Sequence, residues 1–251
     1  MTSLFKRSAV TAAALLLAAS ALIVLPLLPA FARKHPGIEL DLQLTNRNVD
    51  FTAEGFDLAV RARTPPDSGL VARPLEEAAL VVVAAPAYLQ RHRKLRGAAD
   101  LSHHECLPFV QPNTGLPVPW LLQVDGRVVE VPVSGRLRCT DDILGPVTLA
   151  RAGAGVLQTY RFLVEEDLRA GRLVEVLADL AGASRPFSLL YPAGRFMPLR
   201  VRVLVDYLVA QLTAPRKATV RCTSSGWKRR TPRGGLASAV RTLTLPRKSR
   251  S

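Results

Sequence analysis

The sequence predicts an α/β fold of strands and helices, and three stretches carry this prediction. Residues 135–177 have the pattern of a strand, a helix and a further strand, with Gly153 and Gly155 after the helix. Residues 38–44 alternate apolar and polar side chains, as a strand with one buried face does. Residues 198–212 carry apolar side chains at helical spacing, which predicts an amphipathic helix.

The composition is that of a globular chain with a basic end. Of the 251 residues, 48% are hydrophobic and 22% are charged, which excludes a disordered chain. Eleven Lys and Arg and no Asp or Glu lie in residues 215–251, and Lys6 and Arg7 add two charges. Only +1 of the formal net charge of +14 therefore remains for residues 8–214. The positive charge belongs to the tail, and the folded body is nearly neutral.

The sequence contains no pattern typical of a metal site, a disulfide framework or a common catalytic motif. Cys106, Cys139 and Cys222 are odd in number, lie far apart and form no CxxC pair. His103, His104 and Cys106 lie in an extended stretch, where their spacing does not bring three ligands to one ion. GxSxG, HExxH, Walker A and dinucleotide-binding motifs are missing. We therefore expect a protein that is not an enzyme and that uses no metal or cofactor.

The first 32 residues permit two interpretations. Lys6 and Arg7 precede a long apolar run that ends in an Ala-x-Ala pattern at Ala32, which is typical of a secretory signal peptide and long enough to span a bilayer. Residues 25–44 instead have the pattern of a helix, a Pro-Gly turn and a strand, and cleavage after Ala32 would remove the helix. We expect residues 1–24 to be an apolar segment, either a divergent first strand or signal-like. We favour a cytoplasmic protein over a periplasmic one.

The part of the chain before residue 85 is expected to contain further strands, each followed by polar residues. Thr45 and Asn46 form a polar loop after the alternating strand 38–44. Residues 56–61 form the next strand, and the continuous apolar run 80–84 is typical of a strand covered on both faces.

A second group of elements is expected to begin near Ala85. Pro86 occupies the first turn of a helix, and Asp125-Gly126 predicts a two-residue hairpin. The remaining elements are a strand at 137–139, a cap at Thr140-Asp141-Asp142, a helix at 143–151, a strand at 156–159, an acidic helix start at 165–167, a strand from Leu173, and a strand at 184–191. Either Asp141 or Asp142 can accept hydrogen bonds from the first helical amides.

Several separated motifs resemble the effector-binding domain of LysR-type transcriptional regulators. They are LPLLPAFARKHPGIELDLQL at 25–44, FDLAVRARTPPDSGLVARPL at 56–75, DLSHHECL at 100–107 and the stretch from Gly135. The resemblance extends from about Leu25 to Leu212. It implies a two-lobed clamshell with mixed sheets, like that of type 2 periplasmic binding proteins. The domain would span 25–214, with lobe 1 at 25–84 and 187–214 and lobe 2 at 85–186.

The resemblance also implies an effector site in the cleft between the lobes. Ligands of open α/β sheets bind beyond the carboxyl ends of the strands and at helix N-termini. An arginine at the first-lobe strand end would suit an anionic effector, because a guanidinium pairs bidentately with a carboxylate. Each residue also has a structural interpretation, as part of a turn, a helix cap or a partner of a buried backbone group. The candidates are Ser20, Thr45, Asn46, Arg61 and Arg63 from lobe 1, and Thr140, Asp141, Gln158 and Thr159 from lobe 2.

By this resemblance the chain is a small-molecule effector-sensing domain that controls transcription and forms a homodimer. The family carries a winged helix-turn-helix before this domain, whereas residues 1–24 are rich in Ala and Leu. We therefore expect a truncated regulator that contacts DNA only through a helix-turn-helix domain absent from this chain. The alternatives are an exported solute-binding protein with the same clamshell and, more weakly, a gene product without stable function.

The tail, residues 215–251, is rich in Ser, Thr, Gly and Pro and shows no periodicity. This composition predicts disorder. Its charge predicts weak, non-specific binding to polyanions, and an extension without any role is the other interpretation.

Overall fold

A seven-stranded sheet organises the computed structural model, which describes residues 10–16, 22–45, 54–62, 69–193, 197–213 and 241–242, with only the backbone at 10–16 and 241–242. The strand order is β10-β4-β11-β3-β1-β2, and β9 also pairs with β4. Its strands are β1 (Val10–Leu16), β2 (Ile38–Leu44), β3 (Leu58–Arg61), β4 (Leu70–Ala84), β9 (Val156–Tyr160), β10 (Val174–Glu175) and β11 (Ser184–Pro192).

The N-terminal apolar segment supplies a central strand of the first lobe. Strand β1 lies between β2 and β3 and is parallel to both. The predicted strand at 38–44 is confirmed by β2, and β3 covers most of the expected strand at 56–61.

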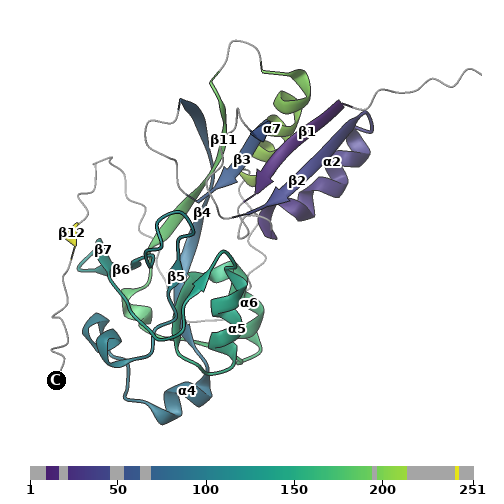
Figure 1. Cartoon of the computed structure of the whole chain (residues 1–251). Coiled ribbons are helices and arrows are strands. Elements are labelled where there is room, and N and C mark those ends of the chain that lie inside the picture. Colours follow the sequence, from purple (N-terminus) through teal and green to yellow (C-terminus); the bar gives the residue numbers. More distant parts are fainter. Residues whose placement is uncertain are drawn as a thin grey trace, which may run out of the picture.

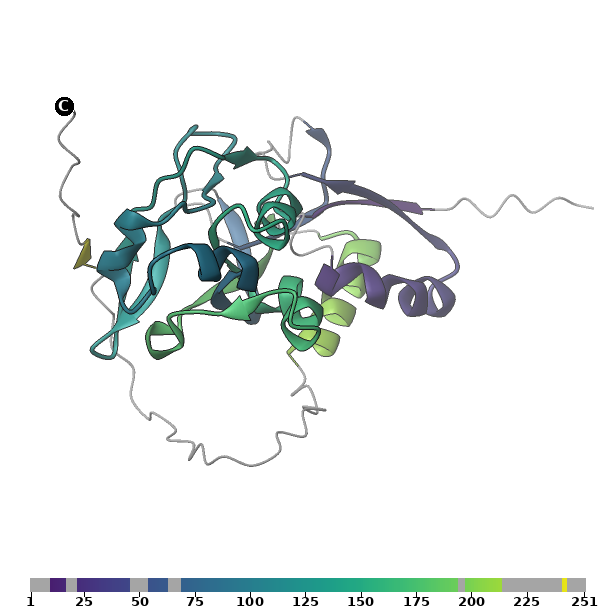
Figure 2. The same cartoon turned by 90° about the horizontal axis from the view of Figure 1, so that it is seen from below.

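Two helices cover one face of the first-lobe sheet, and Figure 2 shows them side by side. They are α2 (Leu28–Lys34), preceded by the 3-10 turn η1 (Leu25–Leu27), and α7 (Leu199–Leu212). The Tyr207 hydroxyl donates to the Leu27 carbonyl at 3.0 Å, and the rings of Tyr207 and Phe31 lie 5.2 Å apart. Val24, Leu28 and Phe31 are buried, so cleavage after Ala32 would remove part of this core.

Helix α7 confirms the predicted amphipathic helix. Its apolar residues face the core at the spacing read from the sequence, and all of them are buried: Val201, Leu204, Val205, Leu208 and Leu212. In the described part of the chain, no helix is long and apolar enough to cross a membrane.

Strands β4 and β11 connect the two groups of elements that Figure 1 shows at its upper right and lower centre. Residues 70–79 of β4 pair with β11, and residues 80–84 pair with β9. Strand β11 pairs on its other side with β3. All five residues of β4 from Leu80 to Ala84 are buried, as the continuous apolar run predicted.

The second lobe combines short strands with helices around a second apolar cluster. The predicted hairpin is confirmed, because Asp125 and Gly126 both have left-handed backbones, with φ of 49° and 74°. The elements are α4 (Pro86–Arg91), η2 (Ala98–His103), β5 (Phe109–Val110), β6 (Trp120–Val124), β7 (Arg127–Val131), β8 (Cys139–Thr140), α5 (Leu144–Arg151), α6 (Arg161–Arg169) and η3 (Ala178–Leu180).

Three elements differ from the sequence prediction. Helix α6 begins at Arg161 rather than at residues 165–167, because its first half buries Leu163 and Val164 and its acidic residues follow them. Strand β8 covers residues 139–140 rather than 137–139, and Leu137 is exposed. In the tail, the two-residue strand β12 (Arg241–Thr242) pairs with β7, and the remainder of 215–251 lies outside the described residues.

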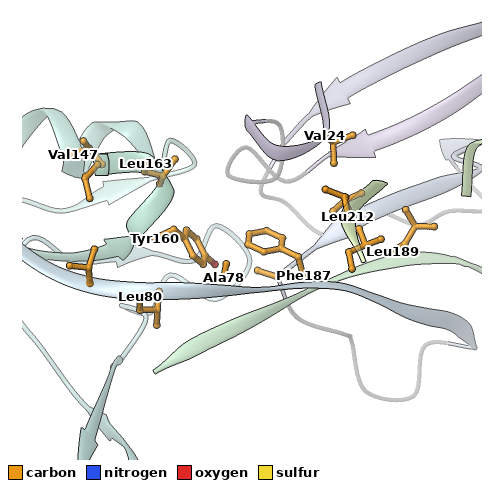
Figure 3. Packing of buried hydrophobic residues seen from close by; sticks show 14 of the residues in the cluster. Val24, Ala78, Leu80, Val147, Tyr160, Leu163, Phe187, Leu189 and Leu212 are labelled. Carbon is orange, nitrogen blue, oxygen red and sulfur yellow. The ribbon is translucent and has the colours of Figure 1, made fainter. Parts of the chain in front are cut away.

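One apolar cluster continues through both lobes. Figure 3 shows Phe187 of β11 at its centre, between Tyr160 on one side and Val24 and Leu212 on the other. The rings of Tyr160 and Phe187 lie 5.2 Å apart at a tilt of 50°. Because this cluster is shared, the lobes are packed against each other where β4 and β11 cross between them.

Candidate functional site

Two candidate residues of the first lobe meet at the carboxyl edge of its parallel strands. Leu16 of β1 lies level with Leu44 on one side and Val60 on the other, so the residues that follow both neighbours lie at the same edge. There the Arg61 Nη1 donates to the Thr45 carbonyl at 3.2 Å. Arg61 is only 9% exposed, which is unusual for an arginine at the end of a strand.

The loop from β8 to α5 presents the next candidates. Asp141 has a left-handed backbone with φ of 66°, and both Thr140 and Asp141 are exposed. Asp142 caps the helix, because its Oδ1 accepts the Leu144 amide at 2.8 Å. Of the two carboxylates that could act as the cap, the structure therefore uses Asp142, and Asp141 lies in the preceding turn.

Gln158 has a structural role in the second lobe. Its Oε1 accepts the Leu121 amide at 2.8 Å, and its Nε2 donates to the Leu121 carbonyl at 2.7 Å. The side chain thus holds β6 against β9 in the way that a strand backbone would. These contacts agree with the interpretation of Gln158 as a hydrogen-bond partner of backbone groups.

The side chain of Thr159, unlike that of Gln158, has no hydrogen-bond partner among the described residues. The residue is 5% exposed, and its Oγ1 is buried. Side chains alternate along a strand, so Thr159 shares a face with Leu157, which packs with Val147 of α5. Thr159 directly precedes Tyr160 in the sequence, and Tyr160 is the N-cap of α6.

An ion-paired carboxylate fixes α5 beside α6. Asp167 is 1% exposed on its side chain and accepts hydrogen bonds from Arg151 at 2.7 Å and from Arg172 at 2.6 Å. Burial alone would raise the pKa of Asp167, but the hydrogen bonds from the two arginines outweigh it and lower the pKa. Arg151 is the last residue of α5 and Asp167 lies in the last turn of α6, so this contact joins the C-terminal ends of the two helices.

A narrow recess in the first lobe leaves no room for a water molecule. Its walls are apolar apart from the Glu76 side chain. No local sequence pattern predicts it, because residues from β3, β4, β11 and the helical segments line it together. Its lining residues are Ile23, Val24, Val60, Leu75, Glu76, Phe187 and Leu212.

The thiols of the described residues do not favour nucleophilic chemistry. Burial is the main cause that raises the pKa of Cys106, to about 12, and burial together with Asp142 raises the pKa of Cys139. Within the described ranges, no three His, Cys, Asp or Glu residues come together as a metal site would require. The candidates Ser20, Asn46 and Arg63 lie outside the described residues.

The comparisons with known proteins identify the domain. Residues 12–213 match the family model of the LysR substrate binding domain. The chain belongs to this LysR family. The family match begins at residue 12, earlier than the resemblance from about residue 25, and therefore includes part of β1.

The relatives of this LysR domain are regulators of transcription. An uncharacterized HTH-type transcriptional regulator, YhjC of Escherichia coli (strain K12), is 35% identical over 188 residues, which cover 74% of this chain and 62% of YhjC. The chain thus spans about three fifths of the length of that relative.

Solved structures of LysR-type regulators share the fold, which is like that of type 2 periplasmic binding proteins. The regulatory domain of CrgA from Neisseria meningitidis has a TM-score of 0.68 and 27% identity, over 80% of this chain and 98% of that one. Full-length AphB, the Vibrio cholerae virulence activator, has a TM-score of 0.69 and 26% identity, over 81% and 69%. The predicted fold class and family are confirmed.

Proposed function

We propose that this LysR domain senses a small anionic metabolite, which it binds between its two lobes to control transcription. The observation that carries the proposal is the buried guanidinium of Arg61 at the carboxyl edge of β3, in contact with the end of β2 at Thr45. Open α/β sheets bind ligands at this edge. A guanidinium pairs with a carboxylate through two parallel hydrogen bonds, which favours a carboxylate effector.

The second lobe contributes polar groups from the start of α5 and the end of β9. Thr140 and Asp141 are exposed before α5, and the Thr159 hydroxyl has no partner among the residues that the structure describes. A buried hydroxyl without a partner costs about 1–3 kcal/mol, and a ligand oxygen would remove that cost. Ser20, Asn46 and Arg63 are further proposed contacts, whereas we assign Gln158 to the support of β6.

The wider activity follows from the relatives. Since these relatives are HTH-type regulators, we propose that a winged helix-turn-helix outside the region shared with them binds DNA. We also propose that the protein acts in the cytoplasm and that this chain has no catalytic role. We also propose a homodimer. Strand β2 is an edge of the described sheet, and Leu22 and Leu44 are 53% and 50% exposed. Sedimentation equilibrium of the purified chain measures this association.

A paired thermal-shift screen tests the effector proposal. Small carboxylates are compared with the corresponding neutral amides, which have the same shape without the charge. We expect one or more carboxylates to raise the melting temperature and their amides to leave it unchanged. A screen in which amides stabilise the domain as well as the acids do would overturn the anionic effector.

Two arginine variants make the screen specific to the site. Arg61→Gln removes the buried guanidinium and should abolish the response to the carboxylate. Arg73→Gln removes a first-lobe arginine whose side chain is 42% exposed and whose ion-pair partner is Asp206, so it should retain the response. Loss of the response in both variants would indicate a general charge effect.

A further inference from the structure

A buried contact between a tyrosine and a histidine joins α4 to the segment 104–107 in the second lobe. The Tyr88 hydroxyl lies 3.1 Å from the His104 Nδ1, and these residues are 1% and 7% exposed. The same hydroxyl oxygen accepts the Glu105 amide at 3.0 Å. The function proposed above uses none of these groups.

The hydrogen-bond pattern favours one position for the imidazole proton. The Tyr88 oxygen accepts the Glu105 amide, and its single hydrogen can then be donated to an unprotonated His104 Nδ1. In this tautomer the neutral ring carries its proton on Nε2. That nitrogen is buried, and the described part of the chain offers it no hydrogen-bond partner.

A second proton has no suitable place in this arrangement. Protonated Nδ1 would face a hydroxyl oxygen that already accepts the Glu105 amide, and the Tyr88 hydrogen would lose its acceptor. The charge would also be placed next to an apolar cluster that contains Tyr88, Cys106, Trp120 and Val156. Acid and the native arrangement of these groups are therefore incompatible.

Neighbouring ionisable groups strengthen this incompatibility. His92 is stacked on Tyr88 with ring centres 4.0 Å apart and lies 6.3 Å from His104. Burial is the largest cause that lowers the pKa of His104, and His92 and His103 lower it further. Asp100 acts in the opposite direction, but its carboxylate is occupied by the backbone amides at positions 96 and 97. Among the described residues, Glu105 and Cys106 also lie beside the contact. Burial is the largest cause that raises the pKa of Tyr88, and the charges of these two groups raise it further.

Segment 104–107 passes any displacement to β9. The Glu105 carbonyl accepts the Val156 amide at 2.8 Å, and the Leu107 amide donates to the Val156 carbonyl at 2.9 Å. The packing leaves little freedom, because a Cβ on Gly155 would lie 2.3 Å from the Glu105 carbonyl oxygen. Strand β9 carries Gln158 and Thr159, so a shift of 104–107 reaches the end of that strand.

We propose that the Tyr88–His104 contact is an acid-sensitive switch: protonation of His104 breaks it, releases α4 from segment 104–107 and loosens the second lobe. Between about pH 6.5, where an unfolded histidine takes up its proton, and the lower native pKa, only the unfolded chain is protonated. The free energy of unfolding therefore decreases as the pH is lowered through this window. Above the window, His104 does not affect it. One proton changes the unfolding equilibrium constant by up to about tenfold per pH unit.

Matched histidine variants of the full chain test the switch by urea unfolding at pH 7.5 and 5.5. His104→Asn places an amide oxygen near the position of Nδ1 but cannot titrate. His103→Asn changes the exposed neighbour. When the pH is lowered from 7.5 to 5.5, we expect the unfolding constant of the wild type and of His103→Asn to increase by up to about tenfold. His104→Asn should lose most of this increase. An unaltered pH dependence in His104→Asn would overturn the proposal.

A measurement on the unmodified chain decides the question even if His104→Asn does not fold. Long-range proton–nitrogen NMR of the imidazole rings should show His104 with its proton on Nε2 at neutral pH and titrating below the ordinary histidine pKa of about 6.5. As His104 titrates, hydrogen-exchange protection of the Glu105 amide should decrease. An Nδ1-protonated ring, titration of His104 at or above that ordinary pKa, or unchanged Glu105 protection would each contradict the switch.

Discussion

Replacement of Gln158 with leucine should destabilise the second lobe. Leucine has no polar side-chain atom and leaves the Leu121 amide and carbonyl without their partners. Each unpaired buried backbone group costs about 1–3 kcal/mol. Because Leu121 and Gln158 are partly exposed, water offsets some of this loss, and we expect a decrease of about 2–3 kcal/mol in the free energy of unfolding.

Urea denaturation followed by tryptophan fluorescence measures this effect, since Trp120 precedes Leu121 and is 3% exposed. Gln211→Leu is the control, because Gln211 is an exposed residue of helix α7 and its change should cost less than about 0.5 kcal/mol. If Gln158→Leu were as stable as the control, the two hydrogen bonds to Leu121 would contribute nothing, and the assignment of Gln158 to structural support would be wrong.

Two further predictions concern the ion pairs and the junction of the lobes. Asp167→Asn should lower stability at pH 7 by about 1–2 kcal/mol, since Arg151 and Arg172 are about half exposed. Because the native pKa of Asp167 is lowered, its stabilisation is present above about pH 3.9 and is lost as the pH falls through the native pKa. Urea unfolding at low pH should therefore show a decrease in the free energy of unfolding of the wild type that the variant lacks. Phe187→Ala should cost about 3–5 kcal/mol in the same assay and Phe187→Leu less, because the ring fills the shared core beside Tyr160; equal stabilities would contradict that packing.

The periodic elements could be predicted from the sequence because their burial is one-sided. Strand β2 and helix α7 each bury one face, so polar and apolar residues recur at the spacing of the element. Strand β4 was recognised only over its last five residues, where it is covered on both faces. Nine of its first ten residues pair with β11, and that partner lies more than a hundred residues away in the chain.

Helix α6 shows why a local rule can fail. Acidic residues usually favour a helix N-terminus, and a start at 165–167 followed from that preference. In the structure Asp167 is instead held by Arg151 and Arg172, one from another helix and one from the following turn. Tertiary pairing thus explains the acidic residues, and the apolar residues before them belong to the helix.

The proximity of two candidate residues could be predicted from the sequence, whereas the contacts of other residues could not. Parallel strands place Thr45 and Arg61 at one edge, and this follows from strand order alone. The contact between Gln158 and Leu121 depends on how β6 lies against β9, which no local pattern encodes. The Tyr88–His104 contact was missed for the same reason, since His104 showed only an unsuitable spacing for a metal.

The affinity of the Thr159→Val variant for a carboxylate effector, measured by calorimetry beside Arg61→Lys, tests most directly whether both lobes hold one ligand. Valine keeps the shape of threonine and removes a buried hydroxyl without a described partner, so the free protein should be as stable as the wild type or more so. If both lobes contact the ligand, each variant should bind at least about tenfold more weakly, which corresponds to about 1.4 kcal/mol. Wild-type affinity in Thr159→Val together with weak binding in Arg61→Lys would confine the ligand to the first lobe and contradict the account.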